Sequence, residues 1–166
     1  MHRRCATWFA LVFIALTLPA QLRAQAPGGW MPSSRSIRAE YYAEVLNHVN
    51  AIAADWAIAW SNDNVDDLME LYADNAVVIP EEGASLRTRE EIRSYFEEYV
   101  KTTGHVESFM LDFDAGGEIA MVYGNWRARM TSGPDAGQEV RGPMVTVYLQ
   151  QGRTRLIRSQ MFRRGG

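Results

Sequence analysis

The stretch DDLMELYADNAVVIP (residues 66–80), followed by TREEIR (residues 88–93), decides the fold of this chain. Asn64 is a residue type that caps helix N-termini, and the residues after it carry apolar side chains at helical spacing. The β-prone run at residues 76–79 ends at Pro80, which cannot donate a backbone hydrogen bond within a sheet. This order predicts a helix, a short strand and a further helix.

The residues that flank this stretch complete the predicted helices. Thr88 and Glu91 have the spacing of a capping box, in which each side chain satisfies a free backbone amide at the start of a helix. Apolar residues also recur every three or four positions from residue 37 to residue 60, which predicts one long amphipathic helix. The helix that starts after Asn64 is expected to include Tyr72.

The rest of the chain is predicted to form a sheet. A brief strand is expected at residues 85–87, and four long strands are expected at residues 105–114, 118–130, 138–150 and 154–162, separated by glycine-containing turns. Helices followed by a mainly antiparallel sheet define an α+β fold, in which the helices must cover one face of the sheet.

The first 24 residues have the features of a secretory signal peptide. A short basic start at residues 2–4 precedes an apolar run at residues 6–20 that is too short to span a bilayer. Cleavage after Ala24 is favoured over cleavage two residues later, where Pro27 would directly follow the cut. An uncleaved membrane anchor is the alternative. Export to the periplasm or the outside of a bacterium is therefore predicted.

Composition limits the class of protein that follows the signal. Residues 25–38 are rich in proline, glycine and serine and are expected to be a flexible leader, and residues 39–164 are expected to be one folded domain. Cys5 is the single cysteine, so the mature chain can have neither a disulfide nor a thiolate metal site. Without the three arginines of the signal, 14 basic residues face 20 acidic ones, and the net charge of −6 argues against nucleic-acid binding. No association with a membrane is expected after cleavage.

Between residues 40 and 162 the chain resembles the nuclear-transport-factor-2-like superfamily, in particular its SnoaL-like and ketosteroid-isomerase-like branches. The resemblance is carried by the segment from Asn64 to Ile79, the capping box that starts at Thr88, and Gly124-Asn125-Trp126 in a later strand. It implies a curved sheet wrapped into a cone around a long helix, a pocket at the open end and frequent dimers. It specifies the fold better than the function, because this fold hosts enzymes and non-enzymatic modules.

The best-known chemistry of these relatives does not carry over to this chain. The resemblance to ketosteroid isomerases places Pro80 at the position of the general base and Trp56 at the position of the tyrosine that stabilises the oxyanion. Proline cannot transfer a proton, and an indole is a poor acid. Isomerase chemistry of that kind is therefore disfavoured, and Glu81 is the carboxylate that remains near the position of the base.

An aromatic set is the candidate pocket lining. In a cone these side chains would either line a site for a ring or an acyl chain, or fill the core between helix and sheet, and both roles are compatible with the sequence. The set consists of Trp56, Trp60, Tyr72, Trp126 and Tyr148.

Three residues are candidates for proton transfer. His48 and Asp55 lie on the same flank of the long helix, but about 10.5 Å apart along its axis, so that only a bound ligand could join them. The alternative for this pair is two half-exposed residues beside the core. Glu81 would act as acid or base if an apolar pocket raised its pKa, and it would otherwise lie in an exposed turn.

No metal ion or cofactor is predicted. His48 and His105 are the histidines of the mature chain, and they lack the short spacing of metal ligands. The expected function is an exported domain that binds a small, largely apolar or aromatic molecule as a homodimer. The alternatives are a cofactor-independent lyase, cyclase or isomerase that uses Glu81 or the pair of His48 and Asp55, and a dimeric interaction module.

Overall fold

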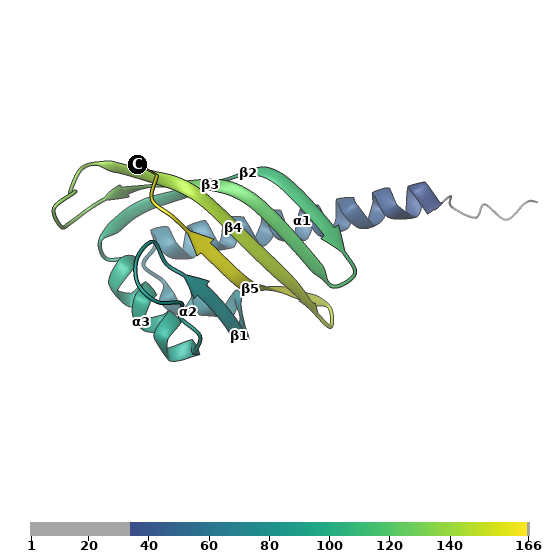
Figure 1. The fold of residues 1–166 in the computed structure, drawn as a ribbon, viewed down its shortest axis with the longest axis horizontal. Helices are drawn as coiled ribbons and strands as arrows, with labels where there is room; N and C mark the ends of the chain where they lie inside the picture. Colours follow the sequence, from purple (N-terminus) through teal and green to yellow (C-terminus); the bar gives the residue numbers. More distant parts are fainter. Residues whose placement is uncertain (1–33, 166) are drawn as a thin grey trace, which may run out of the picture. The chain divides into compact units, whose positions relative to one another are not determined.

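The computed structural model describes residues 34–165, and the predicted signal peptide lies outside this range. The elements are α1 (Ser34–Ser61), α2 (Val65–Glu70), β1 (Tyr72–Ile79), α3 (Arg89–Tyr99), β2 (Thr103–Gly116), β3 (Ile119–Met130), β4 (Glu139–Gln151) and β5 (Thr154–Phe162). The predicted α+β fold with three helices and a mainly antiparallel sheet is confirmed (Figure 1).

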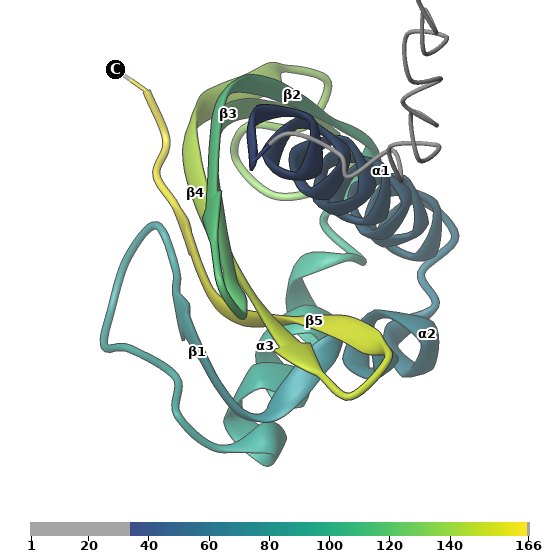
Figure 2. The ribbon, with the colours of Figure 1, turned by 90° about the vertical axis from the view of Figure 1, so that its right-hand side faces the viewer.

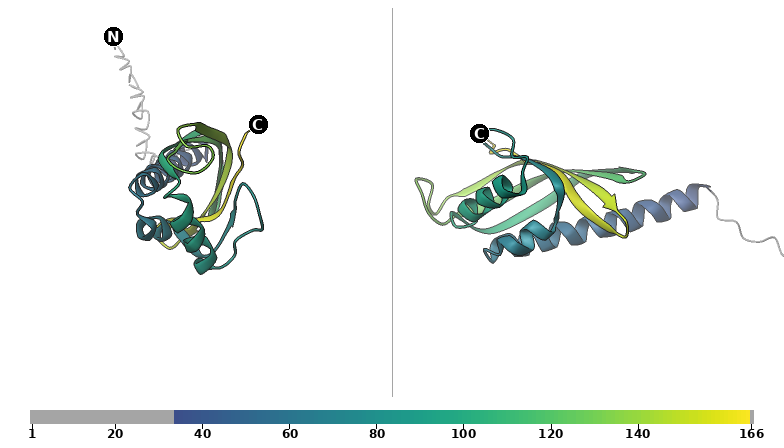
Figure 3. Two further views of the ribbon diagram at one scale, coloured as in Figure 1. Left: turned by 90° about the vertical axis from the view of Figure 1, so that its left-hand side faces the viewer. Right: turned by 90° about the horizontal axis from the view of Figure 1, so that it is seen from below.

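One curved sheet contains all five strands, in the order β1-β5-β4-β3-β2. Neighbouring strands are antiparallel except β1 and β5, which are parallel. The sheet bends around α1, and α2 and α3 lie on the same concave side (Figure 2). Viewed from below, α1 follows the length of the sheet (Figure 3). The helices therefore cover one face, as the α+β layout requires.

The helix starts that the sequence predicts are confirmed. The Asn64 side chain accepts a hydrogen bond from the backbone amide of Asp67 at the start of α2. Thr88 and Glu91 form the complete capping box of α3, since each side chain accepts a bond from the other residue's backbone amide. The two backbone bonds that the Glu91 carboxylate accepts hold the pKa of Glu91 below its ordinary value.

Two predicted boundaries differ from the structure. Tyr72 belongs to β1 and not to the preceding helix, because β1 pairs with β5 from its first residue and Leu71 already accepts a bond from the amide of Ile157. The long helix begins at Ser34, three positions before the predicted start at Ile37. The predicted brief strand is reduced to a single bridge between Val78 and Leu86.

The core lies between the concave face and the helices. Alternate residues of β3 point into it, so that Val122, Gly124, Trp126 and Ala128 are buried while the residues that alternate with them are exposed. This is the alternation that a sheet with one covered face requires. Within residues 34–165, no helix is both long enough and apolar enough to cross a membrane.

Candidate functional site

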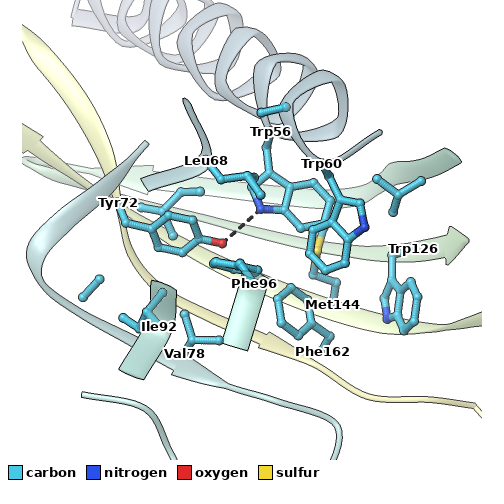
Figure 4. Packing of buried hydrophobic residues seen from close by; sticks show 14 of the residues in the cluster. Trp56, Trp60, Leu68, Tyr72, Val78, Ile92, Phe96, Trp126, Met144 and Phe162 are labelled. Carbon is cyan, nitrogen blue, oxygen red and sulfur yellow. Dashed lines mark hydrogen bonds between the residues drawn. The ribbon is translucent and has the colours of Figure 1, made fainter. Parts of the chain in front are cut away.

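The five aromatic residues of the predicted pocket converge inside the curved sheet. Each is at most 4% exposed, and in Figure 4 Trp56 lies between Tyr72 and Trp60 beneath α1. The ring centroids of Trp56 and Trp60 are 4.9 Å apart, and Phe162 lies within 6.5 Å of both and of Trp126. Trp56, Trp60, Tyr72 and Trp126 are thus brought together with Phe162 as a further member, and Tyr148 belongs to the same buried cluster.

A chain of hydrogen bonds crosses this aromatic core. The Trp56 indole donates to the Tyr72 hydroxyl over 3.0 Å (Figure 4), and that hydroxyl donates to Gln160 Oε1. The Gln160 amide nitrogen in turn donates to Thr146 Oγ1 over 3.3 Å. All four residues are buried, and burial raises the pKa of the Tyr72 phenol well above its ordinary value. The phenol therefore stays protonated and serves as a fixed donor.

Little free space is left among these rings. A cavity of about 10 Å³ lies between Trp56, Trp60, Trp126 and Phe162, with Glu81 and Tyr99 at its side. A space of this size holds one water molecule at most. In the arrangement seen here, the rings pack the core, which is one of the two roles that the sequence leaves open.

A larger open space lies between α1 and β2. It has a volume of about 370 Å³, and Tyr148 forms part of its wall. Alanine side chains face it from α1, and apolar side chains of β2, β3 and β4 face it from the sheet. We call this space the α1–β2 groove, defined by Asn50, Ala53, Ala54, Ala57, His105, Val106, Glu107, Ser108, Phe109, Met110, Val122, Met144 and Tyr148.

Polar side chains form one edge of the α1–β2 groove. His105 Nε2 lies 3.2 Å from Glu107 Oε1, and Arg127 Nε donates to Glu107 Oε2 over 2.9 Å. The Arg127 guanidinium holds the pKa of the Glu107 carboxyl below its ordinary value, so that this carboxylate is charged at neutral pH. The groove thus combines apolar walls with an edge of fixed charge.

Glu81 lies beside the aromatic core and not in a fully exposed turn. Its side chain is 13% exposed, and it lines the small cavity together with Trp56 and Trp60. The Tyr99 hydroxyl donates to Glu81 Oε1 over 2.9 Å. Burial and the neighbouring Glu81 raise the pKa of Tyr99, so that its hydroxyl remains a donor.

His48 and Asp55 are not brought together at a cavity. Both are exposed on α1, and within residues 34–165 no hydrogen bond or ion pair joins them. His48 lies beside a shallow depression next to Arg153 and Arg155, away from the aromatic core. Of the three proton-transfer candidates, Glu81 is the one that lines the small cavity between Trp56 and Trp60.

Several residues of the site are absent from the sequence-based candidates. Gln160, Tyr99 and Arg164 are held by tertiary contacts with residues that are distant in the sequence. Strand parity offers a signal for Gln160, which stands two positions before the buried Phe162 and is therefore expected to face the core. Helical spacing after Ile92 and Phe96 likewise predicts that Tyr99 faces the core, whereas no short-range pattern marks Arg164.

The curved sheet is closed by the long helix α1, and an open groove lies between helix and sheet. This arrangement defines the class of cone-shaped α+β domains. The sequence profile of the SnoaL-like domain family matches residues 53–153 of the chain. The protein therefore belongs to the SnoaL-like domain family. No curated protein gives a significant match to the sequence.

Solved structures with the same fold have little sequence in common with this chain. A ketosteroid isomerase-like protein from Erwinia carotovora has a TM-score of 0.64 and 10% identity, over 73% of this chain and 96% of that one. An NTF-2 like protein of unknown function from Shewanella oneidensis has a TM-score of 0.61 and 13% identity, over 71% and 98% of the two chains. A hypothetical protein with the ketosteroid isomerase-like fold from Catenulispora acidiphila, in complex with trimethylamine, has a TM-score of 0.51 and 20% identity, over 67% and 82%. These likenesses support the fold alone.

Proposed function

We propose that this protein binds a small, largely apolar molecule in the α1–β2 groove. The observation that carries this proposal is an open volume of about 370 Å³ between helix and sheet, which falls within the range of sites for small organic ligands. The cavity among the tryptophans is too small for such a ligand, whereas the groove offers Met110, Met144 and Tyr148 as an apolar wall.

The edge of the groove supplies the polar contacts that would orient the ligand. His105 and Ser108 offer hydrogen-bonding groups, and Asn50 offers an amide from α1. A ligand with an apolar body and one polar end would match the apolar wall and the polar edge of the groove. The structurally similar protein from Catenulispora acidiphila, which is in complex with trimethylamine, supports small-molecule binding by this fold.

Filling the groove with larger side chains is expected to weaken ligand binding. Ala53 and Ala57 face the groove from α1, and leucine has almost the helix propensity of alanine. We expect the double substitution Ala53→Leu/Ala57→Leu to weaken binding of the neutral fluorescent probe N-phenyl-1-naphthylamine at least tenfold, measured by fluorescence titration. Ala43→Leu, an exposed position on the same helix, is the matched control and should bind as the wild type does. Equal binding by all three proteins would contradict the proposal.

A cofactor-independent lyase, cyclase or isomerase is the second candidate function, and Glu81 is the observation that favours it. The Glu81 carboxylate lies beside Trp56 and Trp60 and accepts a hydrogen bond from Tyr99, an arrangement that suits an acid or base next to an apolar substrate. The small cavity beside Glu81 would have to widen before a substrate could enter.

We also propose that the protein forms a homodimer through the outer face of the sheet. Tyr123 is 42% exposed there, and register places Val145 and Met161 next to it and Val147 on the same face. Apolar side chains on a solvent-facing sheet surface are typical of contacts between proteins. Dimer formation through this face would also suit an interaction module that binds no ligand.

A charge in the middle of this face is expected to separate the subunits. We expect twice the chain mass for the wild type in sedimentation velocity and a monomer for Val147→Lys, because an unpaired charge would be buried in the interface. Thr131→Lys, which adds the same charge outside the face, should leave the dimer intact. A wild-type monomer at all concentrations would refute the dimer.

Export to the periplasm or the outside of a bacterium is proposed on the basis of residues 1–24. It agrees with a mature chain that needs neither a thiol nor a disulfide.

A further inference from the structure

Arg155, near the start of β5, is a buried arginine with no acidic partner in the described part of the chain. Only 6% of its surface is exposed, and its Nη1 donates to the backbone carbonyl of Glu118 over 3.1 Å. Its Nε is closed off from solvent and has no acceptor within residues 34–165. The ion pairs formed among these residues involve other cationic side chains. Since a guanidinium keeps its proton at physiological pH, Arg155 carries a positive charge with which none of these carboxylates pairs.

The place of Arg155 in the sheet makes this burial unusual. Ile157, two residues later on β5, is buried in the core, and Arg155 takes the preceding inward position. Arginine is almost never buried to this extent unless it is paired, because an uncompensated charge away from water is costly. An apolar residue would close this end of the core without that cost. The guanidinium is therefore explained by a negatively charged partner that residues 34–165 do not supply.

A shallow depression beside Arg155 has the room and the hydrogen-bond donors for such a partner. It has a volume of about 200 Å³, several times the space of one water molecule, and it lies between α1 and residues 153–155. Guanidinium groups only donate hydrogen bonds, and an imidazole and a hydroxyl can each donate one. No carboxylate of residues 34–165 contributes to the lining, which consists of His48, Ala51, Ile52, Arg153, Thr154 and Arg155.

We infer that this depression, which we call the anion site, binds a small dianionic oxyanion of the phosphate or sulfate class. Arg155 supplies a guanidinium that its bond to the Glu118 carbonyl holds in place, and Arg153 supplies a second one. Two guanidinium groups balance two negative charges, and they bind oxyanions through charge-assisted hydrogen bonds. His48 and Thr154 are available as further donors. The inference goes beyond the proposed function, because the anion site has no residue in common with the α1–β2 groove.

The test is isothermal calorimetry of the purified protein with sodium sulfate and with sodium phosphate, against sodium chloride at the same ionic strength. We expect both dianions to bind, and Arg153→Ala and Arg155→Met to weaken their binding by about tenfold or more, because each substitution removes one charged contact. Arg129→Ala is the matched control and should bind as the wild type does, since Arg129 is exposed on β3 and does not line the anion site.

Thermal unfolding provides a readout that a merely structural role of Arg155 would not produce. Sulfate should raise the melting temperature of the wild type and leave that of Arg155→Met unchanged, since a ligand stabilises only the protein that binds it. Without sulfate, Arg155→Met should be at least as stable as the wild type, because methionine fills the same position without an unpaired charge. A structural arginine would give a less stable variant and no effect of sulfate on either protein.

A carboxylate placed in the anion site should replace the ligand. Ala51 is exposed on α1 and lines the site, and glutamate is well tolerated in a helix. We expect Ala51→Glu to raise the melting temperature in the absence of sulfate and to weaken sulfate binding by about tenfold or more. Ala43→Glu adds the same charge at an exposed position of α1 outside the site, and it should do neither.

Phenyl phosphate in the same calorimetric assay separates two sources of the ligand. Binding equal to that of inorganic phosphate identifies the phosphate group of a larger molecule, and loss of binding identifies the free ion. The inference is overturned if the wild type binds neither dianion more strongly than chloride. It is equally overturned if Arg153→Ala and Ala51→Glu, both at exposed positions where folding is not at stake, bind sulfate as the wild type does.

Discussion

Phe96→Ala is expected to lower the free energy of unfolding by about 3–5 kcal/mol, the cost of a large cavity in a closely packed core. Phe96 lies on α3 and is completely buried. Its ring centroid is 5.5 Å from that of Trp60 and 5.4 Å from that of Tyr72, so that it joins α3 to both α1 and β1. Truncation removes contacts to two other elements at once. Urea denaturation followed by circular dichroism measures the loss.

Phe109→Ala is the matched control for this substitution. Phe109 lies on β2 with 43% exposure, and its ring lies 5.0 Å from the Arg127 guanidinium carbon. Little surface is removed from water there, so the same chemical change should cost less than about 1.5 kcal/mol. Phe96→Leu, which leaves most of the volume filled, should fall between the two variants. A cost of Phe96→Ala no larger than that of Phe109→Ala would show that this aromatic core is not closely packed.

Local signals in the sequence are sufficient for most of the fold. The caps at Asn64 and Thr88 are made by side chains within three positions of their partners, so that a short stretch determines where α2 and α3 begin. Strand parity in β3 likewise predicts which side chains are buried. The errors arise where tertiary pairing decides, as at Tyr72, which the parallel ladder with β5 places in a strand.

The candidate site is less predictable, because it depends on distances between elements that are remote in the sequence. The aromatic character of Trp56, Trp60 and Trp126 is visible in the sequence, but whether the rings leave a space depends on how closely α1 approaches the sheet. The α1–β2 groove exists because small alanine side chains of α1 face β2. To predict this from the sequence, one would have to know how α1 is positioned on the sheet. The contact between Glu81 and Arg164 joins a loop after β1 to the end of the chain.

Tyr72→Phe is expected to destabilise the protein by about 3 kcal/mol, although it removes only one oxygen atom. The Tyr72 hydroxyl accepts a bond from Trp56 and donates one to Gln160, and all three residues are buried. Its removal leaves an indole N–H and an amide oxygen unpaired in the core, and each such group costs about 1–3 kcal/mol. Chemical denaturation of the variant and the wild type gives the difference.

Two further variants separate this hydrogen-bond effect from the general effect of a Tyr→Phe change. Tyr123→Phe alters a tyrosine that is 42% exposed on the outer face of the sheet, and it should change stability by less than about 0.5 kcal/mol. Gln160→Met removes the amide while it keeps the length of the side chain. Because Tyr72 and Gln160 act as a pair, the double variant should be less destabilised than the sum of the two single variants. Additive costs, or a Tyr72→Phe variant as stable as Tyr123→Phe, would mean that Trp56 and Gln160 find other partners when the hydroxyl is removed. The core would then be held by ring packing without the polar chain.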